Sequence, residues 1–75
     1  MGTSVALKIS GRNKLSGKVV NVTPGMVTAE VEIDIGSGNR ITGVITKNSL
    51  EEMQIKTGDE VTALIKATSV MFIKE

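Results

Sequence analysis

The sequence predicts an all-β fold, a small five-stranded barrel with one short helix, and three observations lead to this prediction. Val, Ile and Thr account for 25 of the 75 residues, and β-branched side chains suit a pleated, half-buried surface better than a helix. One segment alternates strictly between apolar and polar residues, which is the period of a strand. Turn sequences rich in Gly lie on both sides of that segment.

The clearest predicted strand covers residues 27–35, where every odd position is apolar and every even position is polar. One face of this strand meets a core and the other meets water. The turns Pro24-Gly25, with Gly25 suited to a positive φ, and Gly36-Ser37-Gly38-Asn39 flank it. They predict two antiparallel hairpins in series over residues 17–46. Further strands are predicted at residues 6–10, 17–23, 40–46, 60–66 and 69–74.

A short helix is predicted over residues 49–54, because Ser49-Leu50-Glu51-Glu52 is a capping-box sequence in which Ser49 caps the Glu52 amide. Gly58 then suits a left-handed turn before the next strand. Three strands, a short helix and two more strands, with an additional N-terminal strand, match a Greek-key barrel of the oligonucleotide/oligosaccharide-binding (OB) kind. A chain of this length makes one domain, residues 1–75.

The composition argues against catalysis. The chain has no Cys and no His, which excludes disulfides, soft-metal sites, thiol nucleophiles and imidazole bases. Its carboxylates fall on the polar face of the alternating strand and on the predicted helix, where they are expected to be solvated. Gly36-Ser37-Gly38 lacks the Lys-Ser/Thr of a phosphate-binding loop. The sequence therefore predicts no enzyme, no catalytic residue, no metal site and no cofactor.

Composition also restricts the partners. The net charge is +1 and Phe72 is the only aromatic residue, so the chain offers neither a basic field nor a stacking platform for nucleic acid. No apolar run approaches the ~18 residues of a membrane span, and the first residues lack the pattern of a signal peptide. We expect a soluble, cytoplasmic protein. So short a chain gains little net stability from its core alone, which favours self-association.

Hydroxyl and cationic donors gather at three predicted strand ends. A small multivalent oxyanion needs such donors, because it offers only acceptors and carries charge. Each residue also has an ordinary structural explanation: Ser49 as a helix cap, Arg12 in a surface ion pair, Lys66 as a solvated strand end, and Ser10 and Thr46 as structural residues without a ligand. The three groups are Ser10-Gly11-Arg12-Asn13, Thr46-Lys47-Asn48-Ser49 and Lys66-Ala67-Thr68-Ser69.

These residues also carry a resemblance to a family. The run from Ile9 to Val19, with its Ser-Gly-Arg-Asn start, resembles the opening of the molbindins, the small molybdenum-pterin-binding (Mop) proteins. The resemblance continues through residues 27–35, 41–46 and 49–52 to Thr62-Ala63-Leu64-Ile65-Lys66-Ala67-Thr68, and covers residues 8–73. The Ser-x-Arg-Asn start and the Ile-Lys-Ala end at this separation form a specific combination.

The resemblance implies an OB-like barrel that binds molybdate or tungstate in the cytoplasm, for storage and homeostasis. It also implies a homohexamer, a trimer of dimers, with oxyanion sites between subunits. The family's site residues carry over onto Ser10, Arg12, Thr46, Ser49, Lys66 and Ala67. Some relatives have Ser after the Lys, whereas Ala67 offers only its backbone.

Two other functions compete with oxyanion storage. An OB module for nucleic acid or oligosaccharide predicts clustered Lys and Arg interleaved with exposed aromatic residues, which this chain lacks. A third possibility that the sequence does not eliminate is a purely structural assembly subunit, whose Ser, Thr and Lys serve only the interface.

Overall fold

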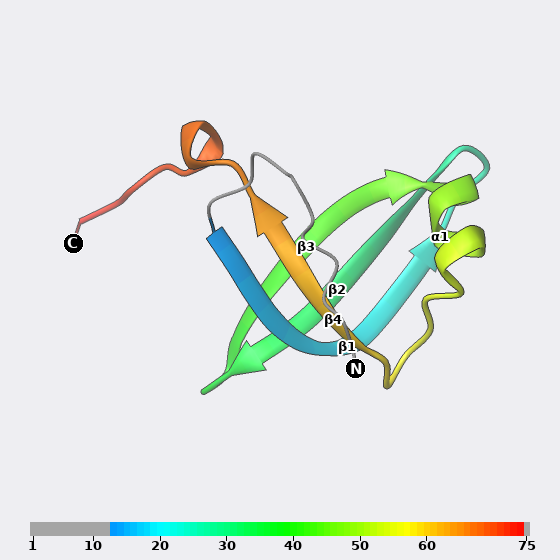
Figure 1. Ribbon diagram of the computed structural model, residues 1–75, viewed down its shortest axis with the longest axis horizontal. Helices are drawn as coiled ribbons and strands as arrows, with labels where there is room; N and C mark the ends of the chain where they lie inside the picture. The colour runs from blue at the N-terminus through cyan, green and yellow to red at the C-terminus, as the bar shows by residue number, and fades with distance from the viewer. Residues whose placement is uncertain (1–12, 75) are drawn as a thin grey trace, which may run out of the picture.

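The computed structural model describes residues 13–74, which form one curled antiparallel sheet and one short helix (Figure 1). The all-β prediction is confirmed. The strands lie in the order β3-β2-β1-β4, so that β3 and β4 are the edges of the described sheet. The elements are β1 (Asn13–Pro24), β2 (Thr28–Gly36), β3 (Asn39–Thr46), α1 (Lys47–Met53), β4 (Glu60–Ile65) and the 3-10 helix η1 (Ala67–Ser69).

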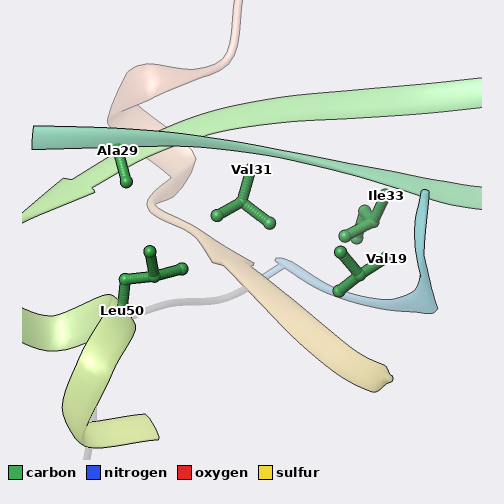
Figure 2. Packing of buried hydrophobic residues seen from close by; sticks show 5 residues of the cluster. All are labelled: Val19, Ala29, Val31, Ile33 and Leu50. Atoms are coloured by element: carbon green, nitrogen blue, oxygen red, sulfur yellow. The ribbon is translucent and has the colours of Figure 1, made fainter. Parts of the chain in front are cut away.

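The core lies on the inner face of β2, where the sequence predicts it. Ala29, Val31 and Ile33 are buried at alternate positions, as a period of two requires. Val19 from β1 and Leu50 from α1 complete this buried cluster, and Figure 2 shows the Leu50 side chain pointing from the helix toward the sheet. Helix α1 is thus held against one end of the curled sheet.

Strand β1 is long and bent, and it pairs with two different neighbours. Its first half pairs with β4 and its second half with β2. A register shift between Val19 and Asn21 adds one residue to β1, and such a bulge increases the bend and twist of a strand. At the bend, a Cβ on Gly17 would lie 2.5 Å from the backbone oxygen of Asp34. Only glycine allows the two strands to approach this closely.

Both predicted hairpins are confirmed, although one turn differs in detail. Gly36 pairs with Asn39 across the β2–β3 turn, and the two residues between them, Ser37 and Gly38, have φ of 54° and 78°. Positive φ at both positions is the geometry that matches the twist of a two-residue hairpin. In the β1–β2 turn the predicted positive φ of Gly25 is wrong. There the Gly25 N–H donates to the Thr28 carbonyl at 2.8 Å.

Other boundaries correct the sequence predictions. The strand predicted at residues 17–23 extends over Asn13–Pro24, and the helix begins at Lys47 rather than at residue 49. The strand predicted at residues 69–74 is wrong for the single chain, because η1 ends at Ser69 and residues 70–74 have no regular structure. The strand predicted at residues 6–10 lies outside the described residues. Four strands of the predicted five-stranded barrel are therefore described.

Candidate functional site

Two of the predicted site residues, Thr46 and Ser49, meet where β3 ends and α1 begins. Thr46 is the N-cap of the helix: its Oγ1 accepts from the Ser49 N–H at 3.0 Å. The cap predicted for Ser49 is wrong, because α1 already begins at Lys47, before the start that the capping-box sequence indicates. The Thr46 hydroxyl donates to the Ser49 Oγ at 2.9 Å. Since a hydroxyl has one proton to donate, this leaves the Ser49 O–H to donate outward.

A hollow of about 420 Å³ lies beside Thr46, which is one of its lining residues. Two of its lining residues, Lys47 and Asn48, carry further donors, and the Lys47 N–H fixes the backbone by donating to the Val27 carbonyl at 2.8 Å. Both belong to the donor-rich run Thr46-Lys47-Asn48-Ser49, although neither is among the predicted site residues. The carboxylate of Glu51 also lines the hollow, and a like charge there opposes a bound anion.

The other described pair, Lys66 and Ala67, lies where β4 ends and η1 begins. The Lys66 carbonyl accepts from the Ser69 N–H at 2.9 Å, and the Lys66 side chain is exposed. This end of β4 lies beside the start of β1, since Ile65 pairs with Asn13. The Asn13 side-chain amide donates to the Ile65 carbonyl at 3.2 Å. Asn13, the last residue of the Ser-Gly-Arg-Asn motif, is thus fixed one residue from Lys66.

The remaining predicted site residues, Ser10 and Arg12, lie outside the described residues. Arg12 immediately precedes Asn13 in the sequence. The covalent chain therefore connects the motif to the end of the β1–β4 ladder that carries Lys66.

The two described pairs lie at opposite ends of the sheet. Thr46 pairs with Thr28 at the start of β2, whereas Lys66 follows Ile65 beside the start of β1. Because β1 and β2 are antiparallel, their starts are at opposite ends. Figure 1 shows α1 and η1 on opposite sides of the molecule. One chain therefore brings Thr46 to Ser49, and Lys66 to Ala67, but does not bring the two pairs together.

The charges around the candidate residues are sparse. Within residues 13–74 the ion pairs are Arg40–Glu32 at 3.7 Å and Lys56–Asp59 at 4.0 Å, so neither Lys47 nor Lys66 pairs with a described carboxylate. No group of three potential metal ligands occurs in the described part of the chain. No helix of that part is long and apolar enough to cross a bilayer. The candidate site can therefore bind a ligand by hydrogen bonds that its hydroxyl, amide and ammonium groups donate.

A match over most of the sequence defines the class of protein. Residues 9–72 match the TOBE domain, and the chain belongs to that family. Its relatives include molybdenum-pterin-binding proteins, as the sequence resemblance indicated. Molybdenum-pterin-binding protein 1 from Clostridium pasteurianum is 49% identical over 67 residues, which are 89% of this chain and 98% of that protein. These relatives are named as binding proteins and not as enzymes.

Solved structures show the same fold. A molybdate-binding protein from Sporomusa ovata superposes with a TM-score of 0.84 at 40% identity, over 91% of this chain and 100% of that one. The cytoplasmic molybdate-binding protein ModG, solved with molybdate bound, gives a TM-score of 0.77 at 38% identity. The match covers 81% of this chain and 43% of the ModG chain. These structures confirm the predicted OB-like fold.

The cap geometry makes a testable prediction about stability. We expect Thr46→Ala to lower the free energy of unfolding by about 0.5–2 kcal/mol, because the first turn of α1 loses its side-chain acceptor. Ser49→Ala should cost less, since Ser49 contributes its backbone N–H to the cap and keeps it. Urea denaturation of the two variants makes the comparison. Equal losses would contradict Thr46 as the cap.

Proposed function

We propose that this protein binds molybdate, and tungstate as the analogous tetrahedral dianion, and stores it in the cytoplasm without converting it. The relatives support the ligand, since they are named as molybdenum-pterin-binding and molybdate-binding proteins. The donor-rich strand ends support it independently, because an oxyanion presents only acceptors. The cytoplasmic location follows the relative ModG, which is described as cytoplasmic.

Each site is formed between two subunits. One chain contributes Lys66, Ala67, Ser10 and Arg12, and a second chain contributes the end of β3 with Thr46 and Ser49. The observation that carries this proposal is the separation of the two described pairs at opposite ends of one sheet. Residues that share a ligand must meet around it, and two chains allow this where one does not.

The donor set also accounts for selectivity against phosphate. Near neutral pH phosphate usually keeps a proton, which would present a donor to a site that furnishes donors only. Molybdate and tungstate carry no such proton. Sulfate carries none either, so the site must reject it by size.

The assembly in this proposal is a homohexamer, built as a trimer of dimers. The described chain buries only five apolar side chains and leaves Met26, Met53 and Leu64 exposed by 94%, 64% and 48%. Association covers such surface and adds the apolar burial that so small a core lacks.

A mixing experiment tests the shared site. Ser49→Ala and Lys66→Ala should each weaken molybdate binding by about 1.5–3 kcal/mol per lost charge-assisted hydrogen bond, because Ser49 carries the hydroxyl whose proton is free to reach the anion. When the two variants are unfolded, mixed and refolded together, a pair of unlike chains contains one site with both residues intact. Titration calorimetry should then show wild-type affinity at a fraction of the sites.

The control is the variant Lys56→Ala in place of Lys66→Ala. Lys56 pairs with Asp59 and belongs neither to the end of β3 nor to the end of β4. That variant should bind molybdate like the wild type on its own. A mixture of the Ser49 and Lys66 variants that binds no more tightly than either alone would overturn the shared site. If the wild-type protein shows no heat with molybdate or tungstate, the proposed function is wrong.

A further inference from the structure

The side chain of Asn13 makes a long-range contact at the end of the β1–β4 ladder. Asn13 pairs in register with Ile65, the last residue of β4, and Figure 1 shows the start of β1 beside the end of β4. The Asn13 side-chain amide donates to the Ile65 carbonyl at 3.2 Å, across 52 positions of sequence. Asn13 is exposed, and an exposed amide is free to bond to water instead. Burial therefore does not account for this contact.

The contact acts on the peptide unit that joins Ile65 to Lys66. Because a peptide unit is planar and trans, the direction of the Ile65 C=O also fixes the direction of the Lys66 N–H. On its other side, Lys66 accepts a hydrogen bond at its own carbonyl from the Ser69 N–H at 2.9 Å. Between these two contacts Lys66 has φ of −66° and ψ of 141°. Both peptide units of Lys66 are thus held, one by the Asn13 side chain and one by the turn of η1.

The Lys66 side chain has no comparable support. It is exposed, and neither ion pair within residues 13–74 includes it. A Lys side chain carries its charge at the end of a flexible stem, and ordering such a stem costs rotamer entropy. The backbone beneath it is the part that the fold can fix before a ligand arrives, and such preorganisation strengthens binding.

We propose that Asn13 is a positioning residue of the oxyanion site, which directs the Lys66 ammonium toward molybdate by holding the Ile65–Lys66 peptide unit. This step rests on the proposed function, which places Lys66 in the site. Asn13 itself does not contact the anion, because it acts through Lys66. Without the Asn13 side chain, the end of the ladder opens more easily, as the ends of elements do, and Lys66 loses its fixed direction.

A second side-chain contact between the same two strands provides a matched comparison. The Ser16 Oγ and the Thr62 Oγ1 lie 3.0 Å apart, and this hydrogen bond is exposed like that of Asn13. Ser16 and Thr62 are opposite each other further along the β1–β4 ladder. Their contact joins two side chains and holds neither peptide unit of Lys66. Ser16→Ala therefore removes one exposed cross-strand hydrogen bond, as Asn13→Ala does, but leaves Lys66 in place.

Titration calorimetry with molybdate compares these two variants. Asn13→Ala should weaken binding by about 3- to 10-fold, the effect of one hydrogen bond, whereas Ser16→Ala should bind like the wild type. Sedimentation should show the same assembly for both variants and the wild type. The proposal is overturned if Asn13→Ala binds as tightly as the wild type, or if Ser16→Ala loses as much affinity as Asn13→Ala.

A double-mutant cycle separates positioning of Lys66 from a general effect on the sheet. When Asn13→Ala is added to Lys66→Ala, we expect less than a 2-fold further loss of molybdate affinity. The ammonium that Asn13 directs is already absent from that background. If Asn13→Ala weakens binding by the same factor with and without Lys66, Asn13 acts by another route and the proposal is wrong.

NMR relaxation of the backbone amides tests the positioning without any ligand. In the wild type, the order parameters of the Lys66 and Ala67 N–H groups should be near the ~0.85 of a rigid backbone, and in Asn13→Ala they should fall toward ~0.6. Ser16→Ala should keep the wild-type values. Order parameters that Asn13→Ala leaves unchanged would overturn the proposal.

The two measurements also distinguish this proposal from the proposed function. If the wild type shows no heat with molybdate or tungstate but Asn13→Ala alone loosens Lys66, Asn13 still fixes Lys66 and oxyanion storage is wrong. If the wild type binds molybdate and Asn13→Ala matches it in affinity and order parameters, oxyanion binding stands and the role of Asn13 is wrong.

Discussion

Replacing Arg12 with Ala should reduce molybdate affinity more than any other single side-chain truncation at the proposed site. Its planar guanidinium can aim two N–H donors at adjacent oxygens of one tetrahedral anion, and its charge persists near neutral pH. Arg12→Lys keeps the charge but loses the fork, and we expect it to weaken binding by about 1–2 kcal/mol. Arg12→Ala loses both and should weaken binding further, as isothermal titration would measure.

The control for this series is Lys14→Ala. Lys14 is a nearby cation on β1 and is exposed, and it pairs in register with Leu64 rather than lying at the strand end. Its removal should change the affinity little. If Arg12→Ala binds molybdate as tightly as the wild type while the assembly remains intact, Arg12 does not belong to the site.

The sequence predicts β2 well because one local pattern determines both its conformation and its buried face. Alternation fixes which residues point inward, and Ala29, Val31 and Ile33 are indeed the buried ones. The β2–β3 turn is predictable for a similar reason, since Gly36-Ser37-Gly38 tolerates positive φ at successive residues. These features depend on residues that are close together in the chain.

The helix cap is predicted less well, because two hydroxyl residues compete for it and their local signals are alike. The Ser49 sequence satisfies the capping-box pattern, yet tertiary contacts decide where the helix begins. Thr46 is the last residue of β3 to pair with β2, and the Lys47 N–H is held by the Val27 carbonyl. The chain must therefore turn at Thr46, and the helix starts at the next residue.

The site geometry could not be predicted from local patterns at all. Lys66 and Thr46 each follow an apolar strand, but only the strand order shows that these two strand ends lie at opposite ends of the sheet. Residues 70–74 illustrate the same limit. Their apolar side chains favour a strand, but a strand needs the edge of another strand to supply its hydrogen bonds, and this segment has no regular structure in the described chain.

The largest loss of stability is expected from Ile33→Ala. Ile33 is 4% exposed on β2 and packs with Val19 in the core (Figure 2). Truncating a buried Ile removes its transfer free energy and leaves a void, which together cost about 2–5 kcal/mol. Small domains have only about 5–15 kcal/mol of stability in total. Thermal and urea unfolding should therefore show a strongly destabilised variant.

Val27→Ala is the control, because Val27 precedes the same strand but is 75% exposed. It should unfold nearly like the wild type, and equal losses for the two variants would contradict the placement of the core. Molybdate should partly rescue Ile33→Ala, since a ligand bound only by the folded assembly adds about 2.7 kcal/mol at a hundredfold excess over Kd. If saturating molybdate leaves the melting temperature unchanged, the proposed molybdate binding is wrong. The placement of the core would still stand.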